Sequence, residues 1–156
     1  MVVDLGIWWY FEFKDHSVLR ILKVHILEML ADVVQVAIIA TFAPGCRYRG
    51  WIDNQSSMFA IRGQTARDRK LMELLYVRHA VLRRAEIQAQ TSEFVGTEDN
   101  TTDPISWGKF TEFLERLRAE QGARDMTCID VARSPLAHEL HALIHHLCSA
   151  ATQTIQ

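Results

Sequence analysis

The sequence has only three cysteines, and they lie far apart at Cys46, Cys128 and Cys148. An odd number of cysteines without a C-x-x-C pair implies no disulfide framework. A chain of this kind is typical of a reducing compartment, so we expect a cytoplasmic location.

We expect no signal peptide in residues 1–15, because they carry Asp4 and Glu12 and no basic segment. Residues 18–43 are strongly apolar, but polar and charged side chains interrupt the first four turns of any helix there. These are Arg20, Lys23, His25, Glu28 and Asp32. A membrane span needs roughly 18 consecutive apolar residues. We therefore expect a core helix and no membrane association.

Neither sign of charge dominates, since 17 Lys and Arg residues stand against 19 Asp and Glu residues. The sequence therefore encodes no global attraction to nucleic acid, and RNA binding would need a local cluster of arginines. The 156 residues are 49% hydrophobic, enough to bury a core, and contain no repeat or low-complexity tract. We expect one helical domain over residues 1–156.

Apolar spacing and capping residues predict four main helices. The first starts at Asp15 or Ser17 and ends at about Phe42, before Pro44–Gly45. The others are predicted from Thr65 to about Gln90, from the region 103–106 to Gly122, and from Ser134–Pro135 onward.

Three further segments complete the predicted fold. Residues 1–14 are rich in β-formers and predict an extended N-terminal arm. Residues 46–63 contain two β-rich runs around a turn-prone segment, which predicts a β-hairpin insertion between the first two helices. Residues 91–103 are polar and acidic and predict a surface loop. The expected fold class is mainly α, a four-helix bundle with a small hairpin.

The segment VARSPLAHELHALIHHL, residues 131–147, contains four of the seven histidines. At about 100° per residue, its leucines and isoleucine form one coherent stripe that faces the core. His138, His141 and His145 form a second stripe on the opposite side. The helix's own packing therefore does not bury these histidines.

A metal site is one interpretation of the histidine stripe, since histidines at i, i+3 and i+7 could supply two or three ligands. However, HELH is not the HExxH motif of zinc proteases, and no thiol or carboxylate nearby in sequence completes the ligand set. We favour structural or solvated histidines over metal ligands, and we expect no metal or other cofactor.

A phosphate site is another interpretation, because Arg133 precedes His138 by five positions at the start of the helix. A phosphodiester needs a guanidinium for its oxygens and a group that moves a proton near neutral pH. The helix N-terminus adds backbone N–H groups at the same place. The competing interpretation is that Arg133 and Ser134 only position the helix start, while His138 faces water.

The stretch ARSPLAHEL resembles the arginine-x4-histidine signature of HEPN domains (higher eukaryote and prokaryote nucleotide-binding), which are helical-bundle ribonucleases. It is closest to versions reading RNPLAHE in accessory ribonucleases of type III CRISPR systems and related defence proteins. The resemblance implies that Arg133 and His138 are catalytic. It also implies that Ser134, at the second, polar position, belongs to the catalytic set as the residue that orients one of them. Family members usually have asparagine or aspartate there, and many have a tyrosine where this chain has Leu140.

The resemblance also implies an activity, namely metal-independent cleavage of single-stranded RNA through attack of the 2′-hydroxyl. It implies a homodimer with a composite site made from two motifs. We expect His141, His145 and Arg124 to contact RNA. A regulatory domain or partner protein is compatible with the sequence. The alternative function is a non-catalytic helical binding or regulatory protein, such as an inhibitor or immunity factor.

Overall fold

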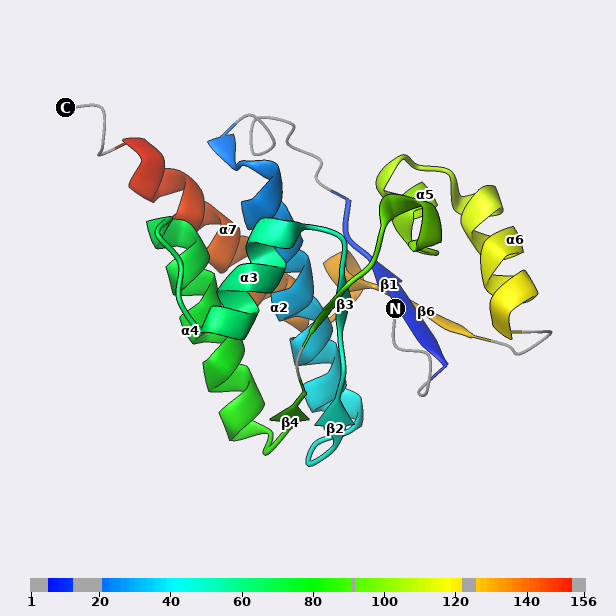
Figure 1. Cartoon of the computed structure of the whole chain (residues 1–156), viewed down its shortest axis with the longest axis horizontal. Coiled ribbons are helices and arrows are strands. Elements are labelled where there is room, and N and C mark those ends of the chain that lie inside the picture. The colour runs from blue at the N-terminus through cyan, green and yellow to red at the C-terminus, as the bar shows by residue number, and fades with distance from the viewer. Residues whose placement is uncertain (1–5, 13–20, 91, 122–125, 153–156) are drawn as a thin grey trace.

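The computed structural model describes residues 6–12, 21–90, 92–121 and 126–152, and these are mainly helical (Figure 1). Four helices lie on one side of the molecule: α2 (Val24–Phe42), α3 (Gln55–Gly63), α4 (Arg69–Arg84) and α7 (Leu136–Thr152). Two further helices, α5 (Asp103–Ser106) and α6 (Phe110–Gln121), lie on the other side. The mainly α fold class predicted from the sequence is confirmed. The strands of the described residues form small two-stranded parallel sheets.

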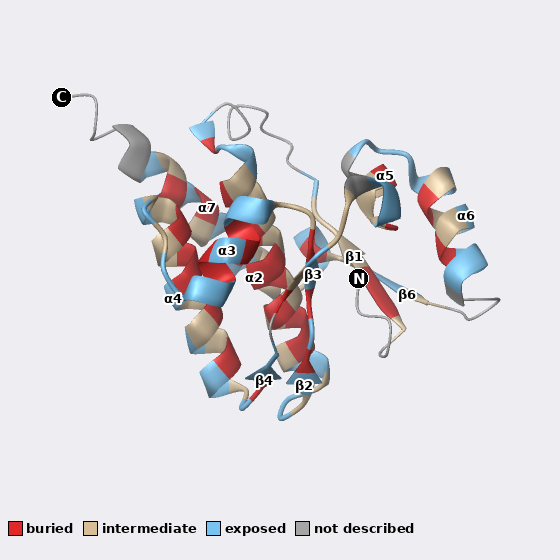
Figure 2. Ribbon diagram, viewed as in Figure 1, coloured by how far each residue is buried: buried red, intermediate tan, exposed pale blue. Residues whose placement is uncertain are grey.

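The helix α2 is the centre of the core, and one cluster of buried apolar residues joins it to α3, α4 and α7 (Figure 2). It ends at Phe42, as predicted, while the predicted caps Asp15 and Ser17 lie outside the described residues. By length and composition alone α2 is long and apolar enough to cross a membrane, but the same is true of buried core helices in soluble proteins. Two of the charged residues in the apolar stretch, Arg20 and Lys23, come before the first residue of α2.

A buried polar network fixes the position of α4 on α2. Arg78 Nε donates to Asp32 Oδ2 at 2.6 Å, and both side chains are at most 5% exposed. Tyr48 Oη donates to Asp32 Oδ1 at 3.1 Å and accepts from Gln35 Nε2 at 3.1 Å. Burial and the Asp32 carboxylate raise the pKa of Tyr48, so its hydroxyl stays protonated. Removing one partner of such a pair costs about 3–5 kcal/mol, so the contact fixes the register of the two helices.

The β-hairpin predicted at 46–63 is wrong. The strands β2 (Arg47–Tyr48) and β3 (Trp51–Ile52) pair in parallel with β4 (Gln88–Ala89) and β5 (Glu93–Phe94). Parallel strands need a long crossover connection, which α3 and α4 provide. The expected turn instead begins α3, because the Asn54 side chain accepts from Ser57 N at 3.1 Å and caps the helix.

The region predicted as a surface loop, 91–103, is more ordered than expected. It contains β5, the 3₁₀ turn η1 (Thr97–Asp99) and the first residue of α5. Ser92 and Thr101 are buried there, at 0% and 8% exposure. Residue 91 lies outside the described residues.

Two predicted helices differ in extent from the structure. Asp68, rather than Thr65, caps α4, since its carboxylate accepts from Lys70 N at 2.9 Å. The helix α4 ends at Arg84, and Glu86 adopts a φ of 56° before the chain enters β4. The third predicted helix is divided into α5 and α6 around Gly108, whose φ of 71° suits glycine.

The predicted N-terminal arm is extended where it is described, but it belongs to a sheet. The strand β1 (Ile7–Tyr10) pairs in parallel with β6 (Thr127–Asp130). Its Trp8 ring lies 5.0 Å from the ring of Phe113, between centroids, and forms a second small core with Leu117 of α6. Residues 1–5 and 13–14 of the arm lie outside the described residues.

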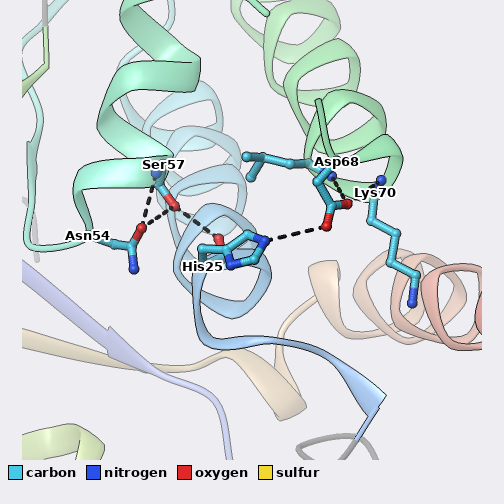
Figure 3. A network of polar contacts seen from close by, with 6 residues as sticks. His25, Asn54, Ser57, Asp68 and Lys70 are labelled. Carbon is cyan, nitrogen blue, oxygen red and sulfur yellow. Dashed lines mark hydrogen bonds and ion pairs between the residues drawn. The ribbon is translucent and has the colours of Figure 1, made fainter. Parts of the chain in front are cut away.

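A polar network joins the start of α2 to the starts of α3 and α4 (Figure 3). Ser57 Oγ donates to the backbone oxygen of His25 at 2.9 Å, next to the Asn54 cap. His25 Nε2 lies 3.5 Å from Asp68 Oδ2, the carboxylate that also binds Lys70 N. Each helix cap contributes about 1 kcal/mol, so this network sets where α3 and α4 begin.

Candidate functional site

The start of α7 is built by a short turn whose polar groups are satisfied locally. The 3₁₀ turn η2 (Val131–Arg133) leads into Ser134, whose Oγ donates to Val131 O at 2.8 Å. The same Oγ accepts from Leu136 N at 3.3 Å, so Ser134 caps α7, as predicted. The hydroxyl is therefore held in place and fixes the path of the chain between Arg133 and His138.

Arg133 lies on the surface, with 88% of its side chain exposed. Its Nε is 3.3 Å from Asp130 Oδ2, and Asp130 Oδ1 accepts from Ala132 N at 3.1 Å. An exposed ion pair contributes about 1 kcal/mol or less and is screened by salt. Arg133 could therefore exchange this carboxylate for a phosphate at little cost.

Two residues beside Arg133, Asp130 and Tyr10, were not predicted from the sequence. The parallel register of β1 and β6 places Tyr10 opposite Asp130. Partial burial and the Asp130 carboxylate raise the pKa of Tyr10, although the Arg133 charge opposes the shift. Tyr10 therefore keeps its proton at neutral pH and can act as a hydrogen-bond donor. Only the strand pairing reveals this contact, since the two residues lie far apart in sequence.

The histidine stripe predicted from helical spacing is present. His138, His141 and His145 are exposed, whereas Leu140, Ile144 and Leu147 of the same helix are buried. The stripe therefore lies opposite the core face of α7, as the periodicity predicted.

His141, His145 and His146 each contact a nearby side chain or backbone group. His141 Nδ1 lies 2.7 Å from Ala137 O, and its ring makes an edge contact with Phe11 at 5.6 Å between centroids. His145 Nδ1 lies 3.5 Å from Ser149 Oγ. His146 points elsewhere, since its Nε2 is 3.3 Å from Glu73 Oε2 on α4.

The predicted site residues are only partly brought together. Arg133, Ser134 and His138 share one end of α7, but within the described ranges no hydrogen bond joins Arg133 to His138. His141 and His145 lie further along the helix. Arg124 lies outside the described residues. Nor do the described residues include a group of three or more His, Cys, Asp or Glu side chains that could hold a metal ion.

Comparison of the chain with protein-family models, with curated proteins and with solved structures finds no match. The function of this surface must therefore be inferred from its own residues.

Proposed function

We propose that the chain is a metal-independent endoribonuclease of the HEPN type, with Arg133 and His138 acting on single-stranded RNA. One observation carries this proposal. A guanidinium and an imidazole are both exposed at the same end of α7, on the side away from the core. Among the described residues, the only ion pair of Arg133 is the weak surface contact with Asp130. Both groups are therefore accessible to a phosphodiester.

The chemistry would proceed by attack of the RNA 2′-hydroxyl on the adjacent phosphorus. As the new oxygen–phosphorus bond forms, the bond to the 5′-oxygen breaks and leaves a 2′,3′-cyclic phosphate and a 5′-hydroxyl. A neutral His138 would accept the proton of the 2′-hydroxyl, and a protonated His138 of a second chain would donate one to the leaving oxygen. Arg133 would stabilise the charge that develops on the non-bridging oxygens.

Ser134 has a positioning role in this scheme. Its hydroxyl is engaged by Val131 O and Leu136 N. It therefore holds the five-residue step from Arg133 to His138 in one geometry, and we assign it no direct contact with RNA. His141, His145 and Arg124 would bind neighbouring nucleotides.

A homodimer completes the proposed site, because one arginine and one histidine are few groups for phosphoryl chemistry. The exposed stripe of α7 offers a face on which the same helix of a second chain can pack. A two-fold axis near Arg133 would place two arginines and two histidines around one phosphate.

An RNA-cleavage assay in EDTA tests this function. Arg133→Ala and His138→Ala should each reduce the cleavage rate by about 10²-fold or more, the usual scale for losing an acid–base group or a charge-stabilising group. The matched control is His146→Ala, which removes an exposed histidine of the same helix that faces Glu73. Cleavage that needs added zinc or magnesium, or that survives His138→Ala, would contradict the proposal.

The alternative is a non-catalytic helical protein that binds RNA or another protein. It is favoured by the open setting of Arg133, whose side chain is 88% exposed rather than enclosed in a cleft. Wild-type protein that binds RNA without cutting it, with affinity unchanged by His138→Ala, would support this alternative.

A further inference from the structure

A second polar centre is built by residues of α3, α4 and the chain that follows α4. It is a pocket of about 650 Å³ between α3, α4 and the chain that follows α4. We call it the basic pocket. Its polar lining includes Arg62, Arg78, His79, Arg83 and Ser92.

The charge of the basic pocket is strongly one-sided. Among the described residues that line it there is no aspartate or glutamate. Asp32, which lies behind the lining, forms the buried ion pair with Arg78 and neutralises one guanidinium. Arg62 and Arg83 leave two positive charges without an acidic residue in the lining. The pocket is therefore suited to a doubly charged anion.

Two buried donors in this lining lack a partner. Arg78 is 2% exposed, and its Nη2 has no hydrogen-bond partner among the described residues, although its Nε binds Asp32. Ser92 is fully buried, and its Oγ likewise lacks a partner within the described part of the chain. Buried donors are nearly always satisfied, because leaving one unpaired is costly. Both residues line the pocket, so small side-chain movements would bring these donors to an acceptor with several oxygens bound there.

The positions of these donors are fixed by the fold. Arg62 Nε donates to Ser92 O at 2.8 Å, which ties α3 to the segment after β4. The Asp32 contact holds Arg78 on α4. Burial and the neighbouring charges of Arg78 and Arg83 lower the pKa of His79. Positive groups are thus held close together in the free protein, and an anion would relieve their repulsion.

We propose that the basic pocket binds a small phosphate monoester. A phosphate monoester carries about −1.5 to −2 charges at neutral pH and three strong acceptor oxygens. These match the two uncompensated arginines and the two unpartnered donors. The pocket also has room for the organic group of the ligand, beside the apolar side chains of Ile61, Leu82 and Ile87. This proposal is independent of the ribonuclease activity proposed for α7.

Isothermal titration calorimetry with three probes tests the proposal: inorganic phosphate, phenyl phosphate and adenosine monophosphate. At least one phosphorylated probe should bind saturably, while phenol and adenosine, which lack the phosphate, should not. Arg83→Gln should weaken binding by about 10-fold, since a charge-assisted hydrogen bond is lost, and Ser92→Ala by several-fold. Both variants keep the buried Asp32–Arg78 pair, whereas a substitution of Arg78 itself risks unfolding the protein.

Arg84→Gln is the matched control, because Arg84 is the neighbouring exposed arginine on α4 and is not part of the pocket lining. It should leave the affinity unchanged. No saturable binding of any probe at millimolar concentration would overturn the proposal. Equal weakening by Arg83→Gln and Arg84→Gln would overturn it as well, since it would show a diffuse electrostatic effect.

An NMR titration of His79 provides a second readout. The charged groups that line the pocket with it are Arg62 from α3 and Arg78 and Arg83 from α4. A bound dianion should raise the lowered pKa of His79, because it favours the imidazolium form. A His79 pKa that does not move when the probe binds would place the ligand elsewhere and overturn the assignment.

Discussion

Replacing Glu28 by glutamine should stabilise the protein relative to wild type. The gain in the free energy of unfolding should be larger at pH 8 than at pH 5. Glu28 lies in the second turn of α2 and is half-buried. Burial, the charge and hydrogen bond of Asp53, and the charge of Asp103 raise the pKa of Glu28 to about 7. Asp53 is itself held by Asn100 Nδ2 at 2.8 Å. Glu28 therefore stays protonated in the folded protein well above the pH at which a free glutamate ionises.

The sign and size of the effect follow from this shift. The folded state binds the proton more tightly than the unfolded chain, so the protonated carboxyl stabilises the fold most below about pH 4.5. That contribution is lost as the pH rises from about 4.5 to about 7. The full shift corresponds to about 3 kcal/mol at about 1.4 kcal/mol per pKa unit. Because Glu28 is partly exposed and solvent screens its charge, we expect about 1–2 kcal/mol.

Urea unfolding followed by circular dichroism measures the difference. Glutamine has the same shape, never ionises and can donate to Asp53, so Glu28→Gln should raise the free energy of unfolding by about 1–2 kcal/mol at pH 8. At pH 5 the difference should be smaller, because only part of the stabilisation by the protonated carboxyl is lost there. The control is Glu115→Gln, which removes an exposed carboxylate of α6 and so measures the effect of the same substitution at the surface. A difference for Glu28→Gln that is the same at both pH values, or that is negative at pH 8, would refute the reasoning.

Two further predictions concern α7. Mixing excess His138→Ala chains with wild type should lower the rate of RNA cleavage more than simple dilution would, because each composite site needs two chains. A protein that is monomeric by light scattering and still cleaves at full rate would exclude this arrangement. His141→Ala and His145→Ala should change RNA affinity or pH dependence more than the rate of the chemical step, since both lie further from Arg133. Stoichiometric zinc in purified protein, lost in these variants, would instead make the stripe a metal site.

Local features of the sequence were enough to predict several parts of this structure. Helix α2 ends before Pro44–Gly45 because proline and glycine do not continue a helix, and Ser134 caps α7 because its hydroxyl reaches a free backbone N–H. The histidine stripe of α7 follows from helical geometry alone, since its apolar residues recur on the opposite face. Each of these signals involves residues within a few positions of one another.

Tertiary structure decided which distant residues meet. Two β-rich runs beside a turn-prone segment predict a hairpin, yet Asn54 caps a helix, and each strand finds a partner about 40 residues away. Arg78 lies among other charged residues in the sequence, yet the packing of α2 on α4 buries it against Asp32, 46 positions away. The basic pocket depends on that packing and on the crossover that brings Ser92 beside Arg62. Local patterns specify helix and strand tendencies, whereas the pairing of buried charges and parallel strands depends on contacts that form only when the whole chain packs.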